Sequence, residues 1–562
     1  MTDNPNSKHI NHINQLLHNK GIKQEDRIGV LTSLFEKRKS LTVGTAAAEA
    51  AVIDPRFSDI MDAINAIDFT NKEISQEIFM LFGSKLTRYK LDQFYTPLTI
   101  SEFITGMMIP GKAAVDPAGG TGDLLVHYNG NIHIWDIDEH ALELCRFNYE
   151  LNMKKNYQIK CANSLIIDNA AAAAAAFDYV TMNPPFGSST VITDNTILQH
   201  YELGVGRKKQ EIGILFLELG LKLLKPDGIL FAIVPAGYVG NSTKPCMELR
   251  GLLLRHRVIA SIELPKQSFK RSGTGVNTYI LVIQKKVPAP STPYPIFISA
   301  IDNIGYELSK ANTPIKYKIV RETGEVYIQD GREVVENDLV ECADQLAHFA
   351  HDEHIPNTVH RADADTLVYD TVVLSSLQNL ILDVKRYSRK YRSLITKLNS
   401  TPGCSTISDL AKIILKPTKI DKNKKYKYID IGEISTPLYG SKELYGWELP
   451  SRAKYTLQKY DILVSKLEGT VSYCVILDDS DNYISTNGVS VIRPKNMNAL
   501  YILFANITKK DFIIQHNAYL TGSIMASLND SDIAGIIMDT QIDVEMTKKM
   551  VEALTALNAL RL

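Results

Sequence analysis

The stretch AAVDPAGGTGDLL, Ala113 to Leu125, decides the fold. Its first residues read as a buried strand, its last residues read as the start of a helix, and three glycines lie between them. Gly119, Gly120 and Gly122 allow the backbone to turn sharply and to approach a ligand, and the helix that follows begins with free N–H groups. The stretch predicts a strand, turn and helix with room for a nucleoside cofactor. The alternative is a glycine-rich turn that binds nothing.

Similar β-rich runs lie further along the chain, separated by helical stretches. They read NIHIWDID (131–138), FDYVTMN (177–183), GILFAIVP (228–235) and TYILVIQKK (278–286). Strands that alternate with helices form a parallel sheet that is covered on both faces. We therefore predict an α/β fold with a doubly wound parallel sheet. The first ninety residues carry apolar positions at helical spacing, such as Ile10, Ile13 and Leu17, and predict a helical region.

Composition excludes several classes of protein. The 562 residues carry a formal net charge of −1, so a nucleic-acid partner would have to meet local basic patches. The six cysteines include no CxxC pair, which argues against a disulfide framework and a zinc knuckle. The N-terminus lacks the apolar region of a signal peptide, and no window reaches the ~18 apolar residues of a membrane span. We expect a cytoplasmic protein.

The run that follows the glycine turn ends in WDID. An acidic residue at the end of the second strand can accept hydrogen bonds from both hydroxyls of a ribose, as it does in dinucleotide-binding folds. We select Asp136 for this role and place Asp138 second. The alternative is that both carboxylates simply open the next helix, where the helix dipole favours negative charge.

The stretch FDYVTMNPPFG, Phe177 to Gly187, ends a predicted strand with two prolines and an aromatic ring. Open α/β sheets bind ligands at the carboxyl ends of their strands, and prolines make a rigid turn without N–H donors. Such a turn can direct the side-chain oxygen of Asn183 and the carbonyl oxygen of Pro184 toward one amino group, while Phe186 offers a stacking face. Two acceptors that hold both protons of an exocyclic amine leave its lone pair free as a nucleophile. The alternative is a loop end with a core phenylalanine.

An ordered series of motifs resembles that of the amino-group DNA methyltransferases, and most closely the modification subunit of type I restriction-modification systems. The series is QFYTP (93–97), DPAGGTG (116–122), WDID (135–138), CANSL (161–165), NPPF (183–186), LKPDGILFAIVP (224–235) and ELPKQSFKRSGTGVNT (263–278). The resemblance implies a class I methyltransferase core that uses S-adenosylmethionine as the methyl donor. It implies no metal.

The resemblance also implies roles for individual residues. Tyr95, Thr96 and Pro97 would lie near the methionine end of the cofactor, and Asp116, Gly119, Gly120, Gly122, Asp136 and Asn163 would complete the cofactor site, with Asp136 at the ribose and Asn163 near the adenine. Asn183, Pro184, Pro185 and Phe186 would be catalytic, and Phe269 would form a second wall beside the target base. The sequence departs from the family pattern at Gly119, where a cysteine is usual, and at Asn163, where many relatives have aspartate.

The C-terminal third resembles one target recognition domain of a type I specificity subunit. The segments that carry this likeness are LDVKRYSRKYRSL (382–394), ISDLAK (407–412), YKYIDIGEI (426–434), LQKYDILVSKLEGTVSYCVI (457–476) and TGSIMASLNDSDI (521–533). Lysines are frequent between Lys412 and Lys427, and of these Lys422, Lys424 and Lys425 are candidates for contacts with DNA phosphates. The alternative is a solvated charged face.

These features suggest five segments. They are a helical N-terminal domain (1–90), a methyltransferase domain (91–290), a linker or subdomain (291–381), a target recognition domain (382–542) and a C-terminal helix (543–562). In the last segment Met546, Met550, Ala553, Leu557 and Leu560 are spaced 4, 3, 4 and 3, as in the seam of a coiled coil. The seam predicts a homodimer on DNA, and the alternative is a helix that packs on its own domain.

The leading hypothesis for function is a sequence-specific DNA adenine-N6 methyltransferase that flips its target base out of the double-stranded DNA. Cytosine N4 is chemically equivalent for the NPPF loop, and only the resemblance favours adenine. Methylation of a protein glutamine or of RNA, and a catalytically idle DNA-recognition subunit, remain as alternatives. Fewer than one hundred helical residues precede QFYTP, so cleavage of DNA would need a separate restriction subunit.

Overall fold

The structure is a computed structural model that describes residues 5–23, 26–43, 54–67, 78, 82, 96–166, 175–185, 190–270, 275–286, 288–309, 315–329, 332–361, 370–373, 381–469, 471–479, 482–522 and 526–559. The chain forms two compact units, Met1–Leu382 and Asp383–Leu562. Each unit is described by itself below.

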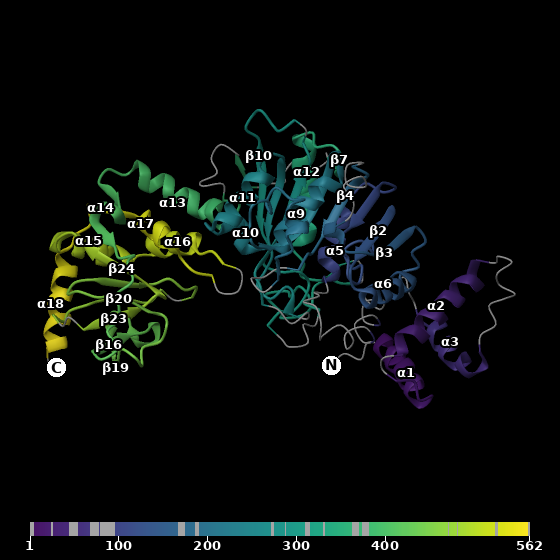
Figure 1. Ribbon diagram of the computed structural model, residues 1–562, viewed down its shortest axis with the longest axis horizontal. Coiled ribbons are helices and arrows are strands. Elements are labelled where there is room, and N and C mark those ends of the chain that lie inside the picture. The colour runs from purple at the N-terminus through teal and green to yellow at the C-terminus, as the bar shows by residue number, and fades with distance from the viewer. Residues whose placement is uncertain are drawn as a thin grey trace. The chain divides into compact units, whose positions relative to one another are not determined.

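A nine-stranded sheet forms the centre of the first unit (Figure 1). Its strands, in chain order, are β1 (Ala113–Asp116), β2 (Asn131–Asp136), β3 (Tyr157–Cys161), β4 (Phe177–Met182), β7 (Leu224–Pro235), β8 (Arg257–Glu263), β9 (Thr278–Gln284), β10 (Pro295–Ala300) and β13 (Asp370–Val373). Their order across the sheet is β13-β10-β8-β9-β7-β4-β1-β2-β3. The predicted α/β class is confirmed, and every run that was expected to be a strand is one.

The prediction of a wholly parallel sheet was wrong, because two strands run the other way. β9 is antiparallel to both β7 and β8, and β13 is antiparallel to β10. Among the described residues between β8 and β9 no crossover helix returns the chain, so β9 enters the sheet in the opposite direction. A mixed sheet of this kind is typical of the class I core of S-adenosylmethionine-dependent methyltransferases.

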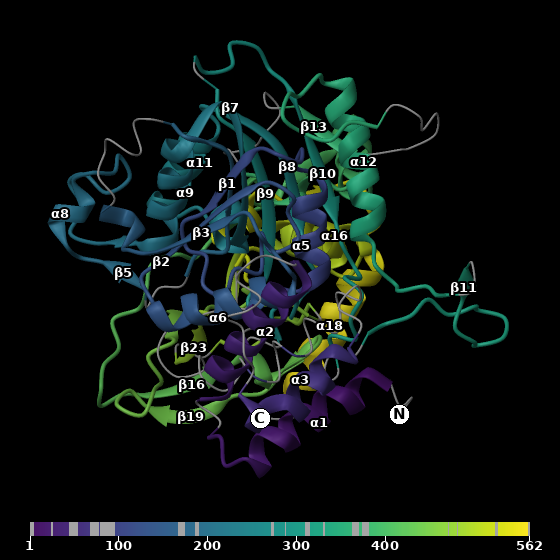
Figure 2. The ribbon, with the colours of Figure 1, turned by 90° about the vertical axis from the view of Figure 1, so that its right-hand side faces the viewer.

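Helices cover both faces of the sheet, as the views in Figures 1 and 2 show. They are α5 (Leu98–Gly106), α6 (Glu139–Leu151), α9 (Ile212–Leu223), α10 (Ala236–Gly240), α11 (Lys244–Leu253) and α12 (Leu339–Asp352), with the short α8 (Asn195–Leu198) and the 3-10 turn η3 (Ser164–Ile166). One hydrophobic core joins α5, α6 and α12 to the side chains of Tyr179, Phe231 and Phe297. On the other face Gly220 of α9 packs so closely that a Cβ there would lie 2.7 Å from Met182 Cε.

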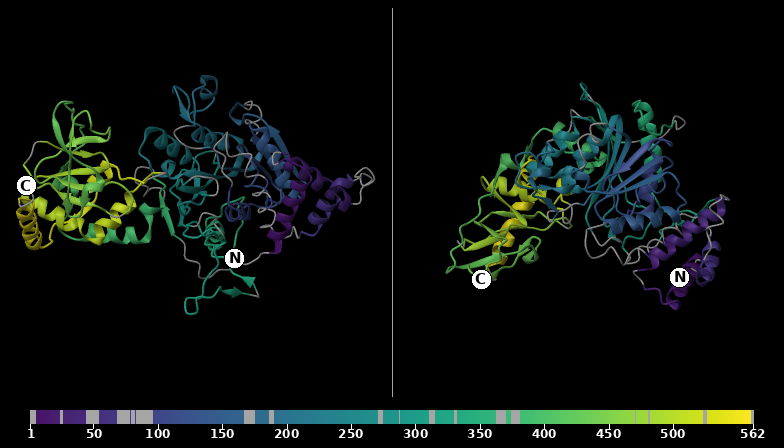
Figure 3. Two further views of the ribbon diagram at one scale, coloured as in Figure 1. Left: turned by 90° about the horizontal axis from the view of Figure 1, so that it is seen from below. Right: turned by 45° about the vertical axis from the view of Figure 1, so that its right-hand side comes forward.

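The N-terminal region is helical where the structure describes it (Figure 3). It contains α1 (Pro5–Asn19), α2 (Arg27–Val43), the 3-10 turn η2 (Pro55–Phe57) and α3 (Ser58–Asn65). The apolar positions that predicted these helices, including Ile10, Ile13 and Leu17, are buried in one core. That core extends to α6, where Phe35 and Phe147 pack edge to face with ring centroids 6.0 Å apart. The N-terminal helices are thus anchored on the helix that follows β2.

Part of the segment expected to be a linker or subdomain, 291–381, extends the central sheet. β10 pairs in parallel with β8, β13 closes that edge, and α12 packs between β10 and α5. The same segment contains a small hairpin of β11 (Ile328–Gln329) and β12 (Arg332–Glu333), which projects from the rest in Figure 2.

The second unit contains two four-stranded sheets. The first has the order β15-β24-β21-β22 and the second the order β19-β16-β23-β20. Its strands are β14 (Cys404–Thr406), β15 (Ala411–Ile413), β16 (Lys425–Ile429), β17 (Ile434–Ser435), β18 (Leu438–Tyr439), β19 (Lys442–Tyr445), β20 (Ala453–Thr456), β21 (Ile462–Ser465), β22 (Tyr473–Val475), β23 (Tyr483–Thr486), β24 (Val489–Pro494) and β25 (Ile537–Asp539). Its helices are α13 (Arg389–Ser400), α14 (Ile407–Leu410), α15 (Met497–Ile507), α16 (Lys510–Tyr519), α17 (Asp530–Ala534) and α18 (Glu545–Ala559).

The last helix, α18, presents two different faces. Val551 is buried, and Val551 and Leu554 pack on the core of the second unit beside α15. The predicted seam points elsewhere, because Met546 is 81% exposed and Met550 and Leu557 are exposed as well. Ala553 is exposed, and Leu560 lies outside the described residues. The helix is therefore held by one face while the seam is left uncovered by described residues of this chain.

No helix among the described residues is long and apolar enough to cross a membrane.

Candidate active site

The glycine turn follows the end of β1, as the sequence predicted. The helix expected after the turn was wrong, because the described residues between β1 and β2 form turns and no helix. Gly122 adopts a φ of +76°, and a Cβ there would lie 2.5 Å from the Tyr149 ring and 2.6 Å from Cys145 Sγ. Gly120 also has a positive φ, +48°, but no atom lies within 4 Å of the place where its Cβ would be. Gly122 is therefore required for packing against α6, whereas Gly120 keeps an open space beside the turn.

Asp136 ends β2 and faces this turn. One carboxylate oxygen accepts a hydrogen bond from the backbone N–H of Gly120 at 2.8 Å, and the other accepts one from the N–H of Asp138 at 2.9 Å. A carboxylate has about four lone-pair positions, so one on each oxygen remains for a ligand. Asp138 instead caps α6 by accepting from the N–H of His140 at 3.1 Å. The geometry favours Asp136 over Asp138 as the group that faces a ligand.

Asn163 follows β3 beside the same edge of the sheet. Its side-chain oxygen accepts a hydrogen bond from the N–H of Leu165 at 3.1 Å and so begins the turn η3. The backbone N–H of Ala162, one residue earlier, donates to the carbonyl oxygen of Asp136 at 2.8 Å. The end of β3 is thus tied to the end of β2. Two large apolar side chains are exposed on these ends, Ile137 at 62% and Ile166.

Two further carboxyl groups lie beneath the turn, of which Asp116 is buried and Asp123 is half-buried. Burial raises the pKa of Asp116, at the end of β1, to about 8, although the N–H of Ala118 donates to its carboxyl at 3.1 Å. Burial also raises the pKa of Asp123 to about 6. Desolvation disfavours the charged form of a carboxyl group, and the nearby carboxylate of Asp136 adds to the effect at Asp116. Asp116 therefore holds a proton at neutral pH.

Asp123 is a residue that sequence reasoning missed. One oxygen accepts hydrogen bonds from the N–H of Thr96 at 3.3 Å and the hydroxyl of Thr121 at 2.9 Å, and the other accepts from the Asn148 amide at 3.1 Å. Asp123 thereby joins the start of α5, the glycine turn and α6. The only signal in the sequence was an acidic residue directly after the last glycine of the turn.

Asn183 lies directly after β4, and its amide donates to the hydroxyl of Thr96 at 3.5 Å. The other end of the same side chain, Oδ1, is buried and accepts no hydrogen bond from the described residues. Buried acceptors are nearly always paired in folded proteins, so an unpaired one indicates a site for a ligand's donor. Through Thr96 and Asp123 this side chain is connected to the glycine turn.

The Pro-Pro turn rests on the start of α9. Gly213 lies beneath it, and a Cβ there would come within 3.2 Å of the Pro185 carbonyl oxygen and 2.8 Å of the Tyr238 hydroxyl. Tyr238, on α10, is buried and donates its hydroxyl proton to Glu211 at 3.1 Å. Only a glycine at position 213 lets the turn approach the helix this closely. Pro184 is buried and Pro185 is half-buried, so the turn is firmly supported.

Comparison with known proteins connects this geometry to a family. The family model described as N-6 DNA Methylase matches residues 77–363, just over half of the chain. The chain belongs to the N-6 DNA methylase family. The matched residues include the glycine turn, Asp136 and the Asn183 loop. The family implies adenine-specific DNA methylation with S-adenosylmethionine as the methyl donor.

Solved structures that match parts of this chain include restriction-modification proteins. The type I methyltransferase subunit from Streptococcus thermophilus is 15% identical over 63% of this chain and 80% of that one, with a TM-score of 0.37. The type IIG restriction endonuclease BpuSI is 13% identical over 98% of this chain and 73% of that one, with a TM-score of 0.46. The HsdS subunit from Thermoanaerobacter tengcongensis is 20% identical over 28% of this chain and 43% of that one, with a TM-score of 0.23. No curated protein matches the sequence significantly.

Several predicted site residues of this N-6 DNA methylase are buried or lie outside the described residues. Phe269 is 1% exposed and belongs to the core of the sheet, so its predicted role as a wall beside the target base is not displayed in this conformation and stays a prediction. Tyr95 and Phe186 lie outside the described residues. Pro97 caps α5 and is half-buried.

The predicted lysine contacts belong to the second unit of the methylase. Lys422, Lys424 and Lys425 are exposed, and none forms an ion pair with a described residue. Lys425 Nζ lies 5.2 Å from the centroid of the Tyr445 ring, and Lys424 Nζ lies 5.8 Å from that of Tyr426. Lys427 differs, because it is half-buried and lies 3.5 Å from Asp478.

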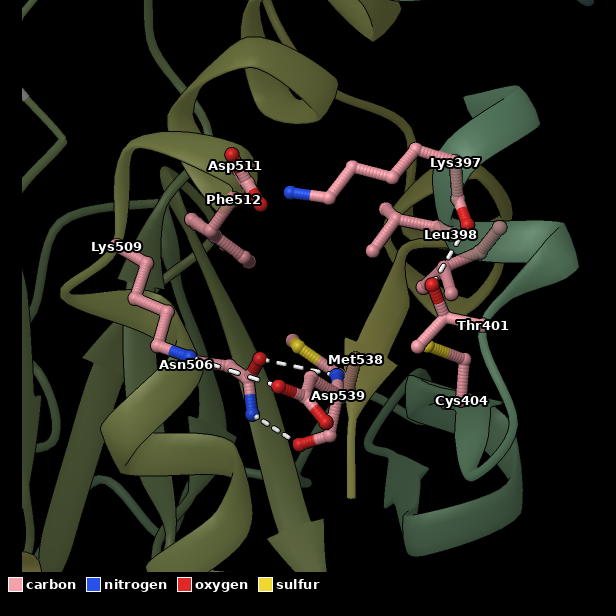
Figure 4. Close-up of a pocket in the computed structure, with 11 residues that line it drawn as sticks. Lys397, Leu398, Thr401, Cys404, Asn506, Lys509, Asp511, Phe512, Met538 and Asp539 are labelled. Atoms are coloured by element: carbon pink, nitrogen blue, oxygen red, sulfur yellow. Dashed lines mark hydrogen bonds and ion pairs between the residues drawn. The ribbon is translucent and has the colours of Figure 1, made fainter. Parts of the chain in front are cut away.

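A pocket in the second unit has no connection with these residues (Figure 4). It lies between α13 and the segments that carry Asn506, Lys509 and Asp539. The Asn506 amide donates to the Asp539 carbonyl oxygen at 2.9 Å and accepts from its N–H at 3.0 Å, and Lys509 Nζ lies 3.7 Å from the Asp539 carboxylate. These contacts pair the polar groups within the protein, and we assign the pocket no part in methylation.

Proposed function

We propose that the chain is a sequence-specific DNA adenine-N6 methyltransferase that acts on an adenine flipped out of the duplex. Membership of the N-6 DNA methylase family supports the reaction, and the single observation that carries the site is the unpaired Oδ1 of Asn183 at the carboxyl end of β4. A target base inside a duplex cannot reach such a loop, so the base has to leave the stack.

The residues around the glycine turn fit S-adenosylmethionine. The open side of Gly120 leaves space for the backbone of the turn to approach a ligand, and the two remaining lone pairs of Asp136 suit two ribose hydroxyls. Ile137 and Ile166 offer apolar surface for a flat base, and the segment that contains Thr96 would lie at the methionine end. When bound, the cofactor supplies an activated methyl group.

Asn183 prepares the amine that receives this group. Its Oδ1 would accept one N–H of the adenine amino group, and the Pro184 carbonyl oxygen would accept the other. An amino group held in this way has its lone pair directed out of the ring plane, where it can act as a nucleophile. The Asn183 Nδ2 group donates to the Thr96 hydroxyl, so Oδ1 rather than Nδ2 would face the substrate. Catalysis here depends on positioning and charge.

We propose that the second unit reads the DNA sequence. Its three exposed lysines, Lys422, Lys424 and Lys425, would bind phosphates and so position the duplex, while other side chains of the unit contact base edges. In this proposal the second unit reads the DNA sequence, while residues of the first unit hold the cofactor and the amine.

The experiment that tests this function uses the purified full chain, S-adenosylmethionine with an isotopically labelled methyl group, and unmethylated genomic DNA. Mass spectrometry of the digested DNA should find the label in N6-methyladenine, and sequencing should place it at one recurring sequence. Label in N4-methylcytosine would change the assigned base. Label found only in protein or RNA would refute the proposal.

We further propose that two copies join through α18. Met546, Met550, Ala553 and Leu557 form an exposed stripe with heptad spacing, while an adjacent face of the helix is anchored through Val551 and Leu554. A second copy can therefore cover the stripe without unfolding the helix. Light scattering should give a dimer on cognate DNA for the full chain. Met546→Glu with Leu557→Glu should give a monomer, and Glu552→Lys, on an exposed position of the same helix, should not. A full chain that stays monomeric on DNA would contradict the dimer.

A further inference from the structure

Two aromatic rings stack on each other at an edge of the second unit. β19 is an edge strand of its sheet, and Tyr445 is its last residue. The rings of Tyr445 and Trp447 lie with centroids 6.3 Å apart and planes inclined by 12°. Trp447 is 66% exposed and Tyr445 is exposed as well. Large rings left in water at the edge of a sheet indicate a binding surface.

The backbone beneath the rings is fixed by hydrogen bonds to the neighbouring segment. The N–H of Gly446 donates to the Lys424 carbonyl oxygen at 2.9 Å, and the N–H of Trp447 donates to that of Lys422 at 3.3 Å. A Cβ at Gly446 would collide with the Asp421 carbonyl oxygen, so glycine is needed between the two rings. The pair is therefore held in place before anything binds, which lowers the entropy cost of binding.

The charge around the rings indicates the partner. Lys422, Lys424 and Lys425 surround the pair on the adjacent segment, are exposed and form no ion pair within the described part of the chain. Two acidic neighbours accept local hydrogen bonds, Asp421 from the N–H of Asn423 at 2.9 Å and Glu448 from that of Tyr445 at 2.7 Å, and the three lysines outnumber them. Lys425 Nζ lies 5.2 Å from the centroid of the Tyr445 ring, so a positive charge stands directly beside the pair. Flat rings beside exposed lysines match a polyanion that carries flat bases.

We propose that the Tyr445–Trp447 pair inserts into a groove of the DNA duplex and packs against a base step, while Lys422, Lys424 and Lys425 bind the flanking phosphates. Aromatic rings stack on bases of any sequence, and apolar wedges that enter a duplex unstack one step and bend it. The inference rests on the proposed function, because it takes DNA as the substrate. It adds a surface of the second unit that deforms the duplex.

The tryptophan content of the chain makes a direct test possible. The chain has two tryptophans, and Trp135 in β2 is 9% exposed. Short duplexes of random sequence, added to the full-length protein, should quench the tryptophan emission of the Trp135→Phe variant and leave that of Trp447→Phe unchanged. Heparin, which offers anionic groups without bases, should compete for the lysines without quenching. Equal quenching in both variants, or binding of duplex without quenching of Trp447, would overturn the proposal.

Affinity measurements separate the rings from the lysines. Trp447→Ala should lower the affinity for duplex roughly tenfold and leave the slope of log affinity against log salt unchanged. Lys424→Ala and Lys425→Ala should each reduce that slope by about 1.

Emission of Trp447 that changes with protein concentration in the absence of DNA would assign the pair to a protein contact and refute the proposal. If Trp447→Ala binds DNA like the wild type and still methylates it, the proposed insertion of the Tyr445–Trp447 pair is wrong while the proposed function stands. If the wild type neither binds nor methylates DNA, the proposed function itself is wrong.

Discussion

The Asn183→Ala variant is expected to lose methyl transfer while it keeps nearly all of its affinity for S-adenosylmethionine. The amide of Asn183 contacts Thr96 at 3.5 Å, and its Oδ1 is the unpaired acceptor at the end of β4, whereas the predicted cofactor contacts come from Asp136 and the glycine turn. Removing one preorganised polar group that acts on the reacting atoms commonly costs about 10²- to 10³-fold in rate. We expect a loss of that size, with a cofactor Kd within about twofold of wild type.

Single-turnover methylation of DNA and titration calorimetry with the cofactor, run on the same preparation, measure the two quantities. Asn195→Ala supplies the matched control, because Asn195 is an exposed asparagine at the start of α8 and loses the same atoms. Asp136→Asn should instead weaken cofactor binding as its main defect, with a smaller effect on the rate of methyl transfer at saturating cofactor. Transfer by Asn183→Ala at more than a few per cent of the wild-type rate would show that another group holds the amine.

A chain that ends at Leu382 is expected to bind cofactor but to lose its preference for one DNA sequence. The boundary falls between the two compact units, and the second unit has hydrophobic cores of its own, so neither part is cut through its interior. Specific DNA sites are typically bound about 10³-fold or more tightly than unrelated DNA, and base contacts provide that difference. We expect the Kd values of the truncated chain for cognate and unrelated duplexes to lie within about twofold of each other.

Gel-shift competition between cognate and unrelated duplexes measures this selectivity, and cofactor titration confirms that the shortened protein is folded. The complementary fragment, Asp383–Leu562, should keep part of the selectivity without any cofactor binding. Full selectivity in the chain that ends at Leu382 would place the reading of sequence in the first unit.

The positions of residues at the ends of predicted strands followed from local patterns. Gly120 lies in the turn after β1, Asp136 ends β2 and Asn183 follows β4, as expected, while their roles in a site stay predictions. Asp123 was missed because its importance depends on Thr96 and Asn148, which lie 27 and 25 residues away. The position of β9 between β7 and β8 was missed for a similar reason, since apolar runs predict strands but not their direction.

Side-chain exposure was the other quantity that the sequence could not supply. The family resemblance implied a site role for Phe269, but its side chain is buried in the core. The stacking of Tyr445 on Trp447 depends on the turn that Gly446 makes against Asp421. The spacing along α18 predicted a seam that would pair with a second copy, which stays a prediction, and the structure shows that Val551 and Leu554 anchor the helix on its own unit.

The buried carboxyl group of Asp116 makes folding a proton-uptake reaction. In the unfolded chain this group ionises near its ordinary pKa of 3.8, whereas burial raises the pKa in the native protein to about 8. Between these values the native state holds a proton that the unfolded state has released, so the free energy of unfolding declines as the pH rises, by about 1.4 kcal/mol per pH unit. Unfolding monitored at pH 5 and pH 8 should therefore show a less stable cofactor-free protein at pH 8, with a smaller difference in Asp116→Asn. The loss is nearly complete at pH 8, and the carboxyl group that causes it lies beside the turn where the cofactor is proposed to bind.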